Sequence, residues 1–519
     1  MPTNKLELSK LFDLQVLVLE SDIELSHLTK QMLFSLGIKK LDAIRSIEEL
    51  SQREISTSYD VIFLNDETND RMNGAEIVES LIALGVLPNR TRLVLLSANN
   101  ASAQYAIEYP YHQFSYVERP FNKNHLDHEL KQQVMFSPFL KPILSLAGLY
   151  RYQDALKLLL HTQQQTLPAG LEEVLLRLKV QLLLEMYKFE AAVPLLKQAV
   201  NEQQGWALWA LFRIRYERGD VQSCAAFLAE PSDELARFPE RRELWRLYLA
   251  IKTADFYQAA QIARQIPSAS MSAKMADLVH LVLVESGDIE FAIEFIERKR
   301  RLAIRGDIYI QLTVAYARTL LIQLNTIKDP EEKTKIVEQI QHLLEVMRQD
   351  KKAENHQLSI VMLQTGLIFL HDSKSAAMAY WQQHQALLTQ PQSIPLLSHA
   401  AMLMAALGES SSALDFLFKA SCGYAHQLDN SYRVFCSCMH QYAFQKVVSP
   451  AKRAEAYVHF ALQHLSRDEK MPAAKMLWAA CQITPTPSLL SQLYAILREQ
   501  GLSRFRGLNV PPASTAPAP

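Results

Sequence analysis

Hydrophobic positions in the first 125 or so residues follow two alternating periods. Short apolar or β-branched runs, typical of buried strands, alternate with stretches in which apolar residues recur every three or four positions, as on one face of a helix. The runs that predict strands are 15–19, 39–43, 61–64, 92–96 and 114–117. The stretches that predict helices are 23–36, 47–55, 75–84, 101–107 and 123–134. Five strands that alternate with helices predict a doubly wound α/β domain with a five-stranded parallel sheet.

From about residue 137 no strand pattern recurs, and helical stretches come in pairs. In each pair the first helix ends at a short turn, and the second carries a small residue near its start. Because the two helices of a hairpin cross closely, a small residue is needed where they touch. The small residues are Ala155, Ala191, Cys224, Ala259 and Ala292, at successive spacings of 36, 33, 35 and 33 residues. Such spacings are typical of a helix-turn-helix repeat. After about residue 305 the spacing loosens, with pairs expected around Ala376, Ala413, Ala454 and Ala474.

The change of pattern divides the chain into three parts. Residues 1–135 are predicted to form the α/β domain, and residues 136–500 an all-α superhelix of helical repeats. Residues 501–519 end in a run of Pro and Ala and are predicted to be a disordered tail. The chain has 14 glycines and is 49% hydrophobic, which favours long helices with short turns over a β-rich fold with many corners.

Charge and cysteine content exclude several classes of partner. A net charge of −1 and a pI near 7.0 predict no binding to nucleic acid and none to a membrane surface. No window reaches the roughly 18 uninterrupted apolar residues of a membrane span, and the N-terminus lacks the pattern of a signal peptide. Five cysteines, odd in number and widely spaced, predict a chain without disulfides in a reducing cytosol. We therefore expect a cytoplasmic protein.

Polar residues follow the predicted strands at their carboxyl ends, where the functional crevice of a doubly wound sheet lies. These residues are Glu20 and Ser21 after the first strand, Asn65 and Asp66 after the third, Ser97 after the fourth, and Arg119 after the fifth. With this set, residues 14–134 resemble the receiver domain of bacterial two-component response regulators. The resemblance implies a flavodoxin-like sheet and a site related to phosphoryl transfer.

In that family, two acidic residues and an aspartate at the end of the third strand hold Mg²⁺, and the aspartate accepts a phosphoryl group. The resemblance places Glu20 and Ser21 at the acidic pair and Asn65 at the phosphoacceptor position. The remaining matches are Ser97 at the hydroxyl that contacts the phosphoryl group, Arg119 at the usual lysine before proline, and Tyr116 at the switch aromatic position. Three of the family's charged or reactive groups are therefore replaced in this chain.

These replacements change the chemistry of the pocket. An amide cannot form an acyl phosphate, and it carries no charge to bind Mg²⁺. With neutral side chains at Asn65 and Ser21, Glu20 is the main anion. We therefore expect Arg119 to pair directly with Glu20 and to lock the pocket. The prediction is a degenerate phosphoacceptor pocket that is not phosphorylated, with no catalytic residue, no metal and no cofactor.

Asp66 leaves a second hypothesis open. If its side chain reached the pocket, it would be an alternative phosphoacceptor, and Glu20, Asp22 and Asp66 would be the Mg²⁺ ligands. The chain would then be a working phosphorelay response regulator, phosphorylated by a histidine kinase. Because side chains alternate along a strand, a residue directly after Asn65 is expected to face away from the pocket.

The helical pairs resemble tetratricopeptide-type repeats over about residues 139–500, with degenerate motifs. The stretches GDVQSCA and GDIEFAI keep the glycine turn and the small residue, while most other pairs keep only the spacing. Arrays of this kind hold partner segments on a concave face, so the resemblance implies protein partners.

Together the two resemblances favour a signalling adaptor that is not an enzyme. The receiver-like domain would dock on a signalling component, or form a homodimer, through the face made by its fourth helix, fifth strand and fifth helix. The repeats would recruit an effector. An enzyme with an unrecognised site in the repeats is a further alternative. Cys436, Cys438 and His440 resemble a metal cluster, but residues two apart on a helix do not face each other, so we expect them to pack between helices.

Overall fold

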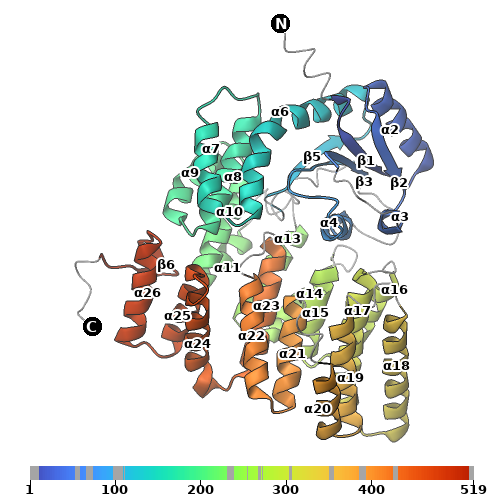
Figure 1. Cartoon of the computed structure of the whole chain (residues 1–519), viewed down its shortest axis with the longest axis vertical. Coiled ribbons are helices and arrows are strands. Elements are labelled where there is room, and N and C mark those ends of the chain that lie inside the picture. Colours follow the sequence, from blue (N-terminus) through green and yellow to red (C-terminus); the bar gives the residue numbers. More distant parts are fainter. Residues whose placement is uncertain are drawn as a thin grey trace.

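The structure is a computed structural model of the chain (Figure 1). It describes residues 11–52, 59–65, 74–97, 109, 111–230, 239–253, 255–266, 271, 273–302, 307–349, 356–384, 393–424 and 430–512. An α/β domain at the N-terminus is followed by a long array of helices, so the predicted multi-domain fold class is confirmed. Figure 1 shows the array leading away from the α/β domain and then turning back, so that its last helices lie near its first.

The N-terminal sheet has five parallel strands in the order β2-β1-β3-β4-β5. The sequence placed each strand to within one residue at either end, because buried parallel strands read as short continuous apolar runs. The predicted helix 101–107 lies outside the described residues. The strands are β1 (Gln15–Leu19), β2 (Lys40–Ile44), β3 (Val61–Asn65), β4 (Arg92–Ser97) and β5 (Gln113–Glu118). The helices of this part are α2 (Ile23–Ser35), α3 (Ile47–Gln52), α4 (Gly74–Ala83) and α6 (Lys123–Gly148).

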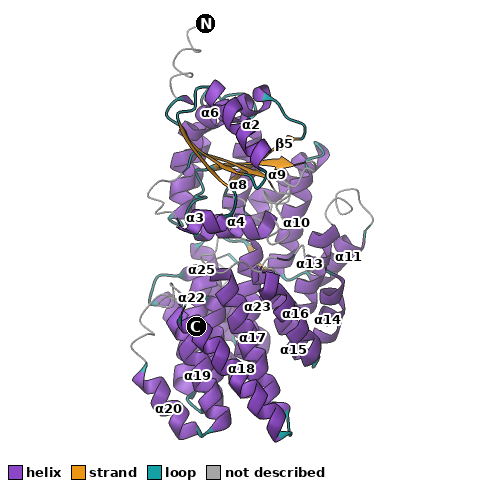
Figure 2. Ribbon diagram, turned by 90° about the vertical axis from the view of Figure 1, so that its right-hand side faces the viewer, coloured by secondary structure: helices purple, strands orange, loops and turns teal. Residues whose placement is uncertain are grey.

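Helices cover both faces of the sheet, as the alternation of side chains along a strand requires. Leu17 and Leu19 of β1 belong to a core with α4. Val16 and Val18 of the same strand point to the opposite face and pack with α2 and α6. Figure 2 shows the sheet between α2 and α6 on one side and α3 and α4 on the other. This layering leaves the carboxyl ends of the strands as the edge at which a site can form.

Helix α6 joins the sheet to the array. Leu126 and Leu130 in its first half pack against the sheet. Phe136 in its second half belongs to the core of the first hairpins. The predicted domain boundary after residue 135 therefore falls inside one helix of 26 residues. Tyr111, just before β5, is 1% exposed in that second core. The sheet and the array thus share packed surface as well as a helix.

The array is a succession of helical hairpins. None of the helices within the described residues is both long and apolar enough to cross a membrane. In chain order the helices are α7 (Tyr152–Thr162), α8 (Leu171–Glu185), α9 (Phe189–Asn201), α10 (Gly205–Arg218), α11 (Val221–Ala229), α13 (Pro239–Lys252), α14 (Phe256–Gln265), α15 (Ala273–Glu285), α16 (Ile289–Leu302), α17 (Asp307–Thr326), α18 (Pro330–Arg348), α19 (Gln357–His371), α20 (Lys374–Gln383), α21 (Ile394–Ala406), α22 (Ser410–Tyr424), α23 (Asn430–Val447), α24 (Arg453–Leu465), α25 (Lys470–Ile483) and α26 (Pro487–Glu499).

Eight hairpins within the described residues share one local rule. The residue that caps the second helix accepts, through its carbonyl oxygen, the backbone N–H of the residue four positions later. That later residue is always small and fully buried, because it lies where the two helices cross. The eight are Ala155, Ala192, Cys224, Ala259, Ala292, Ala377, Ala413 and Ala473, each 0% exposed.

The predicted repeat positions are wrong by one residue in three hairpins. Ala191 and Ala376 are exposed, and their neighbours Ala192 and Ala377 are the buried ones. In the third hairpin Ala473, and not the predicted Ala474, makes the bond to the capping residue, although both are buried. The sequence of two adjacent alanines does not reveal which of them faces the partner helix. The geometry of the preceding turn determines which one lies at the crossing. The turn before Ala192 contains Tyr187 with a φ of 58°, where other turns have a glycine, so the expected marker is missing there.

Helix α23 lies on the inner face of the array, which is the face made by the first helices of successive hairpins. It contacts α13, α15 and α21. Near its start, Arg433 forms an ion pair with Glu185 at the end of α8. The resemblance to tetratricopeptide repeats implied a concave face open to a partner segment. Over this stretch the chain's own helix occupies that face instead, because the array turns back on itself.

The end of the described chain is packed. Strands β6 (Arg504–Phe505) and β7 (Leu508–Asn509) form a short antiparallel hairpin after α26. Phe505 is 2% exposed, and its ring centroid lies 6.0 Å from that of Tyr187. The prediction of a disordered tail over residues 501–519 is therefore corrected for residues 501–512, since an aromatic anchor holds them. Residues 513–519 lie outside the described residues.

Candidate functional site: the strand-end pocket and the inner face of the array

The carboxyl ends of β1 and β3 meet at the buried carboxylate of Glu20, which is 1% exposed. Its Oε1 accepts a hydrogen bond from Nδ2 of Asn65 at 2.8 Å and another from the backbone N–H of Asp22 at 3.0 Å. Its Oε2 accepts a hydrogen bond from Nη2 of Arg119 at 3.1 Å. Three donors hold this carboxylate, and one of them is a cation. This is the arrangement that a buried ionised carboxylate requires.

The ion pair that the sequence predicted between Arg119 and Glu20 is present. The Arg119 side chain is 21% exposed and that of Glu20 is 2% exposed, so the carboxylate is the buried partner and the guanidinium lies on its solvent side. The Arg119–Pro120 bond is cis. Asn65 fits beside Glu20 because its amide donates a hydrogen bond. A second ionised carboxylate at that position would repel the first.

Asp22 does not point its carboxylate into this pocket. It caps α2, where its Oδ1 accepts the backbone N–H groups of Glu24 at 2.8 Å and Leu25 at 3.0 Å. A divalent cation of the Mg²⁺ type needs several oxygen ligands, preferably anionic. Among the described residues, the one carboxylate at the pocket already neutralises Arg119. The described donors therefore do not fit Mg²⁺.

The other residues that the sequence singled out lie around this pocket. Ser21 is half-buried after β1, and Tyr116 on β5 is half-buried against the core. Ser97 is the last residue of β4, and its backbone is in register with Glu118. The side chain of Ser97 and the whole of Asp66 lie outside the described residues. The structure thus brings together Glu20, Asn65 and Arg119.

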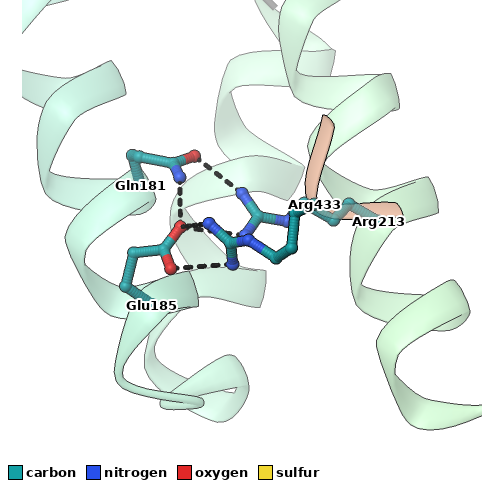
Figure 3. A network of polar contacts seen from close by, with 4 residues as sticks. All are labelled: Gln181, Glu185, Arg213 and Arg433. Atoms are coloured by element: carbon teal, nitrogen blue, oxygen red, sulfur yellow. Dashed lines mark hydrogen bonds and ion pairs between the residues drawn. The ribbon is translucent and has the colours of Figure 1, made fainter. Parts of the chain in front are cut away.

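A second buried carboxylate lies on the inner face of the array. Glu185, the last residue of α8, accepts hydrogen bonds from Nη2 of Arg213 at 2.9 Å and from both terminal nitrogens of Arg433 at 2.9 and 3.0 Å. Gln181 donates to Glu185 at 2.6 Å and accepts from Nη1 of Arg213 at 3.0 Å. Figure 3 shows the four side chains converging from α8, α10 and α23. The network therefore fastens the returning helix to the first half of the array.

The electrostatics of this network favour the charged forms. Burial acts to raise the pKa of Glu185, but Arg433 and Arg213 outweigh it and bring that pKa to about 2. Glu185 in turn raises the pKa of Arg433, against the effect of burial. The sequence gave no signal for this network, because Glu185 and Arg433 are 248 residues apart and each lies in an ordinary helical stretch. Only the fold brings them together.

Two of the cysteines, Cys436 and Cys438, pack in the interior together with His440. Cys436 and Cys438 are buried, and Nε2 of His440 contacts the carbonyl oxygen of Leu417 at 3.1 Å. These three residues therefore pack between helices, as expected from their spacing.

A separate group of possible metal ligands combines Cys422, His464 and Glu469. Both ring nitrogens of His464 already have partners, Ser421 at 3.0 Å and Glu469 at 2.6 Å. Burial raises the pKa of Cys422 to about 11, which keeps it a thiol rather than the thiolate that binds metals. This group is therefore a hydrogen-bonded cluster.

Comparison with known proteins gives no family for this chain. No family model matches it, and no curated protein does. Among solved structures it is similar to the TPR domain of P58(IPK), with 13% identity, 71% of this chain and 99% of that chain covered, and a TM-score of 0.16. It is also similar to a chain of the APC/C hetero-tetramer Cut9-Hcn1, with 12% identity, 78% and 79% covered, and a TM-score of 0.27.

A third similar structure is a signal transduction ATPase (STAND) protein with a tetratricopeptide repeat sensor from Pyrococcus horikoshii. Its identity is 10%, the coverage is 97% of this chain and 93% of that chain, and the TM-score is 0.25. TM-scores this low carry no argument about what the chain binds.

Proposed function

We propose that the chain is a cytoplasmic adaptor of bacterial two-component signalling. In this proposal the receiver-like domain is not phosphorylated, and the helical array binds partner proteins. The observation that carries the proposal is the closed carboxylate of Glu20, whose oxygens are taken by Asn65, the Asp22 backbone and Arg119. A phosphoryl group and Mg²⁺ would have to displace a buried ion pair and would meet an amide in place of a nucleophile.

The way in which the two parts are joined supports a scaffold rather than a switch. Helix α6 is shared between the sheet and the array, and Tyr111 beside β5 is buried in the array's first core. The segment that leads into β5 is thus packed into the array. We propose that a signalling partner, or a second copy of the chain, uses the face along the edge strand β5.

We also propose that the chain is not an enzyme. The buried charged groups described above neutralise one another in pairs or networks, and structural ion pairs of this kind shift pKa values without a catalytic role. An active site usually holds titratable groups with strongly shifted pKa values in an open cleft, poised to gain or lose a proton. Glu185, with a pKa of about 2 and two arginines on it, is poised for neither.

Phosphorylation is the process that tests this function most simply. The full chain is incubated with a small phosphodonor and Mg²⁺, and its intact mass is measured. We expect no change in mass. A matched variant that combines Ser21→Asp with Asn65→Asp restores both carboxylates and is expected to gain one phosphoryl group. A phosphoryl group gained by the wild type and removed by Asp66→Ala would instead make the chain a working phosphorelay regulator.

A further inference from the structure

The end of the array packs against its first half around the ring of Tyr187. The ring centroid of Phe505, from the hairpin of β6 and β7, lies 6.0 Å from that of Tyr187. Nζ of Lys475 on α25 lies 4.8 Å from the same centroid. The guanidinium of Arg506, next to Phe505, lies 4.8 Å from the ring of Trp478, which is about one turn after Lys475 on α25. Lys475 and Arg506 are therefore two cations on the same side of α25, each held against an aromatic ring.

These two cations have no counter-ion among the described residues. Neither side chain forms an ion pair or a hydrogen bond with a described residue. Lys475 and Arg506 are half-buried, so each keeps surface that a solute can reach. A cation that lies over a ring keeps N–H groups for other acceptors, and both side chains are hydrogen-bond donors only. An anion from solution would supply the acceptor that both lack.

Glu217 on α10 is half-buried and is the carboxylate on which Lys475 acts most strongly. Burial acts to raise the pKa of Glu217, but Lys475, followed by Arg213 and Arg506, outweighs it and lowers that pKa. Burial lowers the pKa of Lys475 to about 8, and Arg506 and Arg433 act in the same direction, against Glu217. The ammonium of Lys475 is therefore still charged at pH 7, although its surroundings already hold an excess of positive charge.

The balance of charge in this part of the molecule is positive. Arg213 and Arg433 already donate to Glu185. Lys252 on α13 adds a cation, whose Nζ donates to the carbonyl oxygen of Tyr216 at 2.9 Å and whose pKa is lowered by burial and by Arg506. Among the described residues, the interacting cations are Arg213, Lys252, Arg433, Lys475 and Arg506, and the carboxylates are Glu185 and Glu217. Because the cations outnumber the carboxylates by more than one, an anion with two charges fits the imbalance better than an anion with one.

We propose that Lys475 and Arg506 bind a phosphate-type dianion, either the free ion or a phosphate monoester. The planar guanidinium of Arg506 donates to two phosphate oxygens, and the ammonium of Lys475 adds a compact point charge. The carboxylate of Glu217 acts against the same anion and limits its affinity. The site depends on the charges of this chain alone, so it is independent of the proposed adaptor function.

Phosphorus NMR of the full chain measures the binding, with inorganic phosphate and methyl phosphate titrated at constant ionic strength to hold screening fixed. We expect saturable binding of phosphate at one site, and acetate, a monoanion, should compete at least about tenfold more weakly. Binding of methyl phosphate as well would show that a monoester fits, and binding of phosphate alone would assign the site to the free ion. Absence of saturable binding for both probes, or equal competition by acetate, would overturn the inference.

Two variants with matched controls locate the site. Lys475→Gln and Arg506→Gln are each expected to weaken phosphate binding about tenfold, the loss expected for a hydrogen bond to a charged group. The controls are Lys197→Gln, exposed on α9, and Arg504→Gln, exposed in the same hairpin as Arg506. Both controls are expected to bind phosphate as the wild type does. Equal loss in the controls would show a general attraction of anions to the surface and would overturn the inference.

Glu217→Gln gives an effect of the opposite sign. Because it removes the carboxylate that acts against the anion, it is expected to bind phosphate about two- to fivefold more tightly. Its control is Glu190→Gln on α9, which is exposed and is expected to bind phosphate as the wild type does. A damaged fold would weaken binding, so a gain in affinity separates an electrostatic role of Glu217 from a structural one. Unchanged or weaker binding by Glu217→Gln would overturn the inference.

Discussion

Two buried polar groups on the inner face of the array differ in their hydrogen bonds. In the first half, the carboxylate of Glu185 is held by Arg213, Arg433 and Gln181, and a helix of the same chain covers it. In the second half, Nδ1 of the buried His280 has no hydrogen bond among the described residues. Both groups lie on first helices of hairpins, so the repeat itself does not explain the difference.

The difference shows that one repeat can hold a buried polar group fully hydrogen-bonded in one place and leave a buried nitrogen without a hydrogen bond among the described residues in another. A buried charge with every hydrogen bond made is costly to disturb, so it fixes the geometry of the array. A buried polar atom that lacks a hydrogen bond costs stability. The predictions below test each side of this contrast.

The largest effect is expected at Glu185. Glu185→Gln would remove the carboxylate to which Arg213 and Arg433 donate and would leave Glu217 as their nearby anion, and we expect a loss of about 3–5 kcal/mol in the free energy of unfolding. Urea denaturation of the full chain measures it. The matched control is Glu190→Gln, because Glu190 is 44% exposed in its ion pair with Arg218 and should cost no more than about 1 kcal/mol. Equal losses in the two variants would contradict a structural role for the network.

The next largest effect concerns the hairpin that follows Glu185. Ala192→Leu would force a large side chain into the crossing of α8 and α9, and we expect it to cost about 1–3 kcal/mol. Ala191→Leu, one residue earlier and exposed, should stay within about 0.5 kcal/mol of the wild type. Thermal or urea unfolding distinguishes the two. The reverse order would mean that the buried position of this repeat is misplaced.

Stability is expected to fall as the pH decreases from about 6.5 because of His280. Its pKa is about 3 in the folded chain and 6.5 in its ordinary state, so below pH 6.5 the unfolded chain binds a proton that the folded chain does not. One such group contributes a slope of up to about 1.4 kcal/mol per pH unit. Urea denaturation between pH 6.5 and 5 should give a shallower slope for His280→Gln than for the wild type.

Glu185 provides the contrast in that titration. Its pKa of about 2 lies below the ordinary value of 4.5, so its contribution to stability is fully present above pH 4.5 and is lost only as the pH falls toward 2. It therefore adds no slope between pH 6.5 and 5. An unchanged slope in His280→Gln would show that this ring does not remain neutral in the folded chain.

The smallest effect is expected at the strand-end pocket. Arg119→Met keeps most of the aliphatic length and removes one of three donors to Glu20, and we expect a loss of about 1 kcal/mol. Arg151→Met is the control, since Arg151 is 60% exposed in its pair with Asp154 and should change stability by less. If Arg119→Met were as neutral as the control, the pair with Glu20 would not hold the pocket closed.

The sequence predicted the parts of this molecule that depend on local pattern. The five strands and the Arg119–Glu20 pair follow from apolar runs and from the positions of polar residues at strand ends. The repeat was also visible, but its register failed at Ala191, where an adjacent alanine offers a second candidate for the crossing. The sequence could therefore give the element and its period, but it left open which of two like residues faces inward.

Contacts between distant parts of the chain could not be predicted in the same way. Arg433 reaches Glu185 across 248 residues, and Phe505 packs near Tyr187. In the sequence around it, Arg433 resembles a solvent-exposed arginine. Phe505 likewise resembles an aromatic residue in an unstructured tail. The return of the array onto itself creates both contacts. These contacts depend on the curvature of the whole array, which no single stretch of sequence specifies.

The closed state of the Glu20 carboxylate can be measured directly by fluorine NMR of the full chain with Mg²⁺ and beryllofluoride, a mimic of the bound phosphoryl group. We expect only the resonances of free beryllofluoride species, because Arg119 and Asn65 already occupy the one carboxylate that the described pocket offers. A bound resonance that requires Mg²⁺ and disappears in Asp66→Ala would contradict this and would show a pocket that can still accept phosphate.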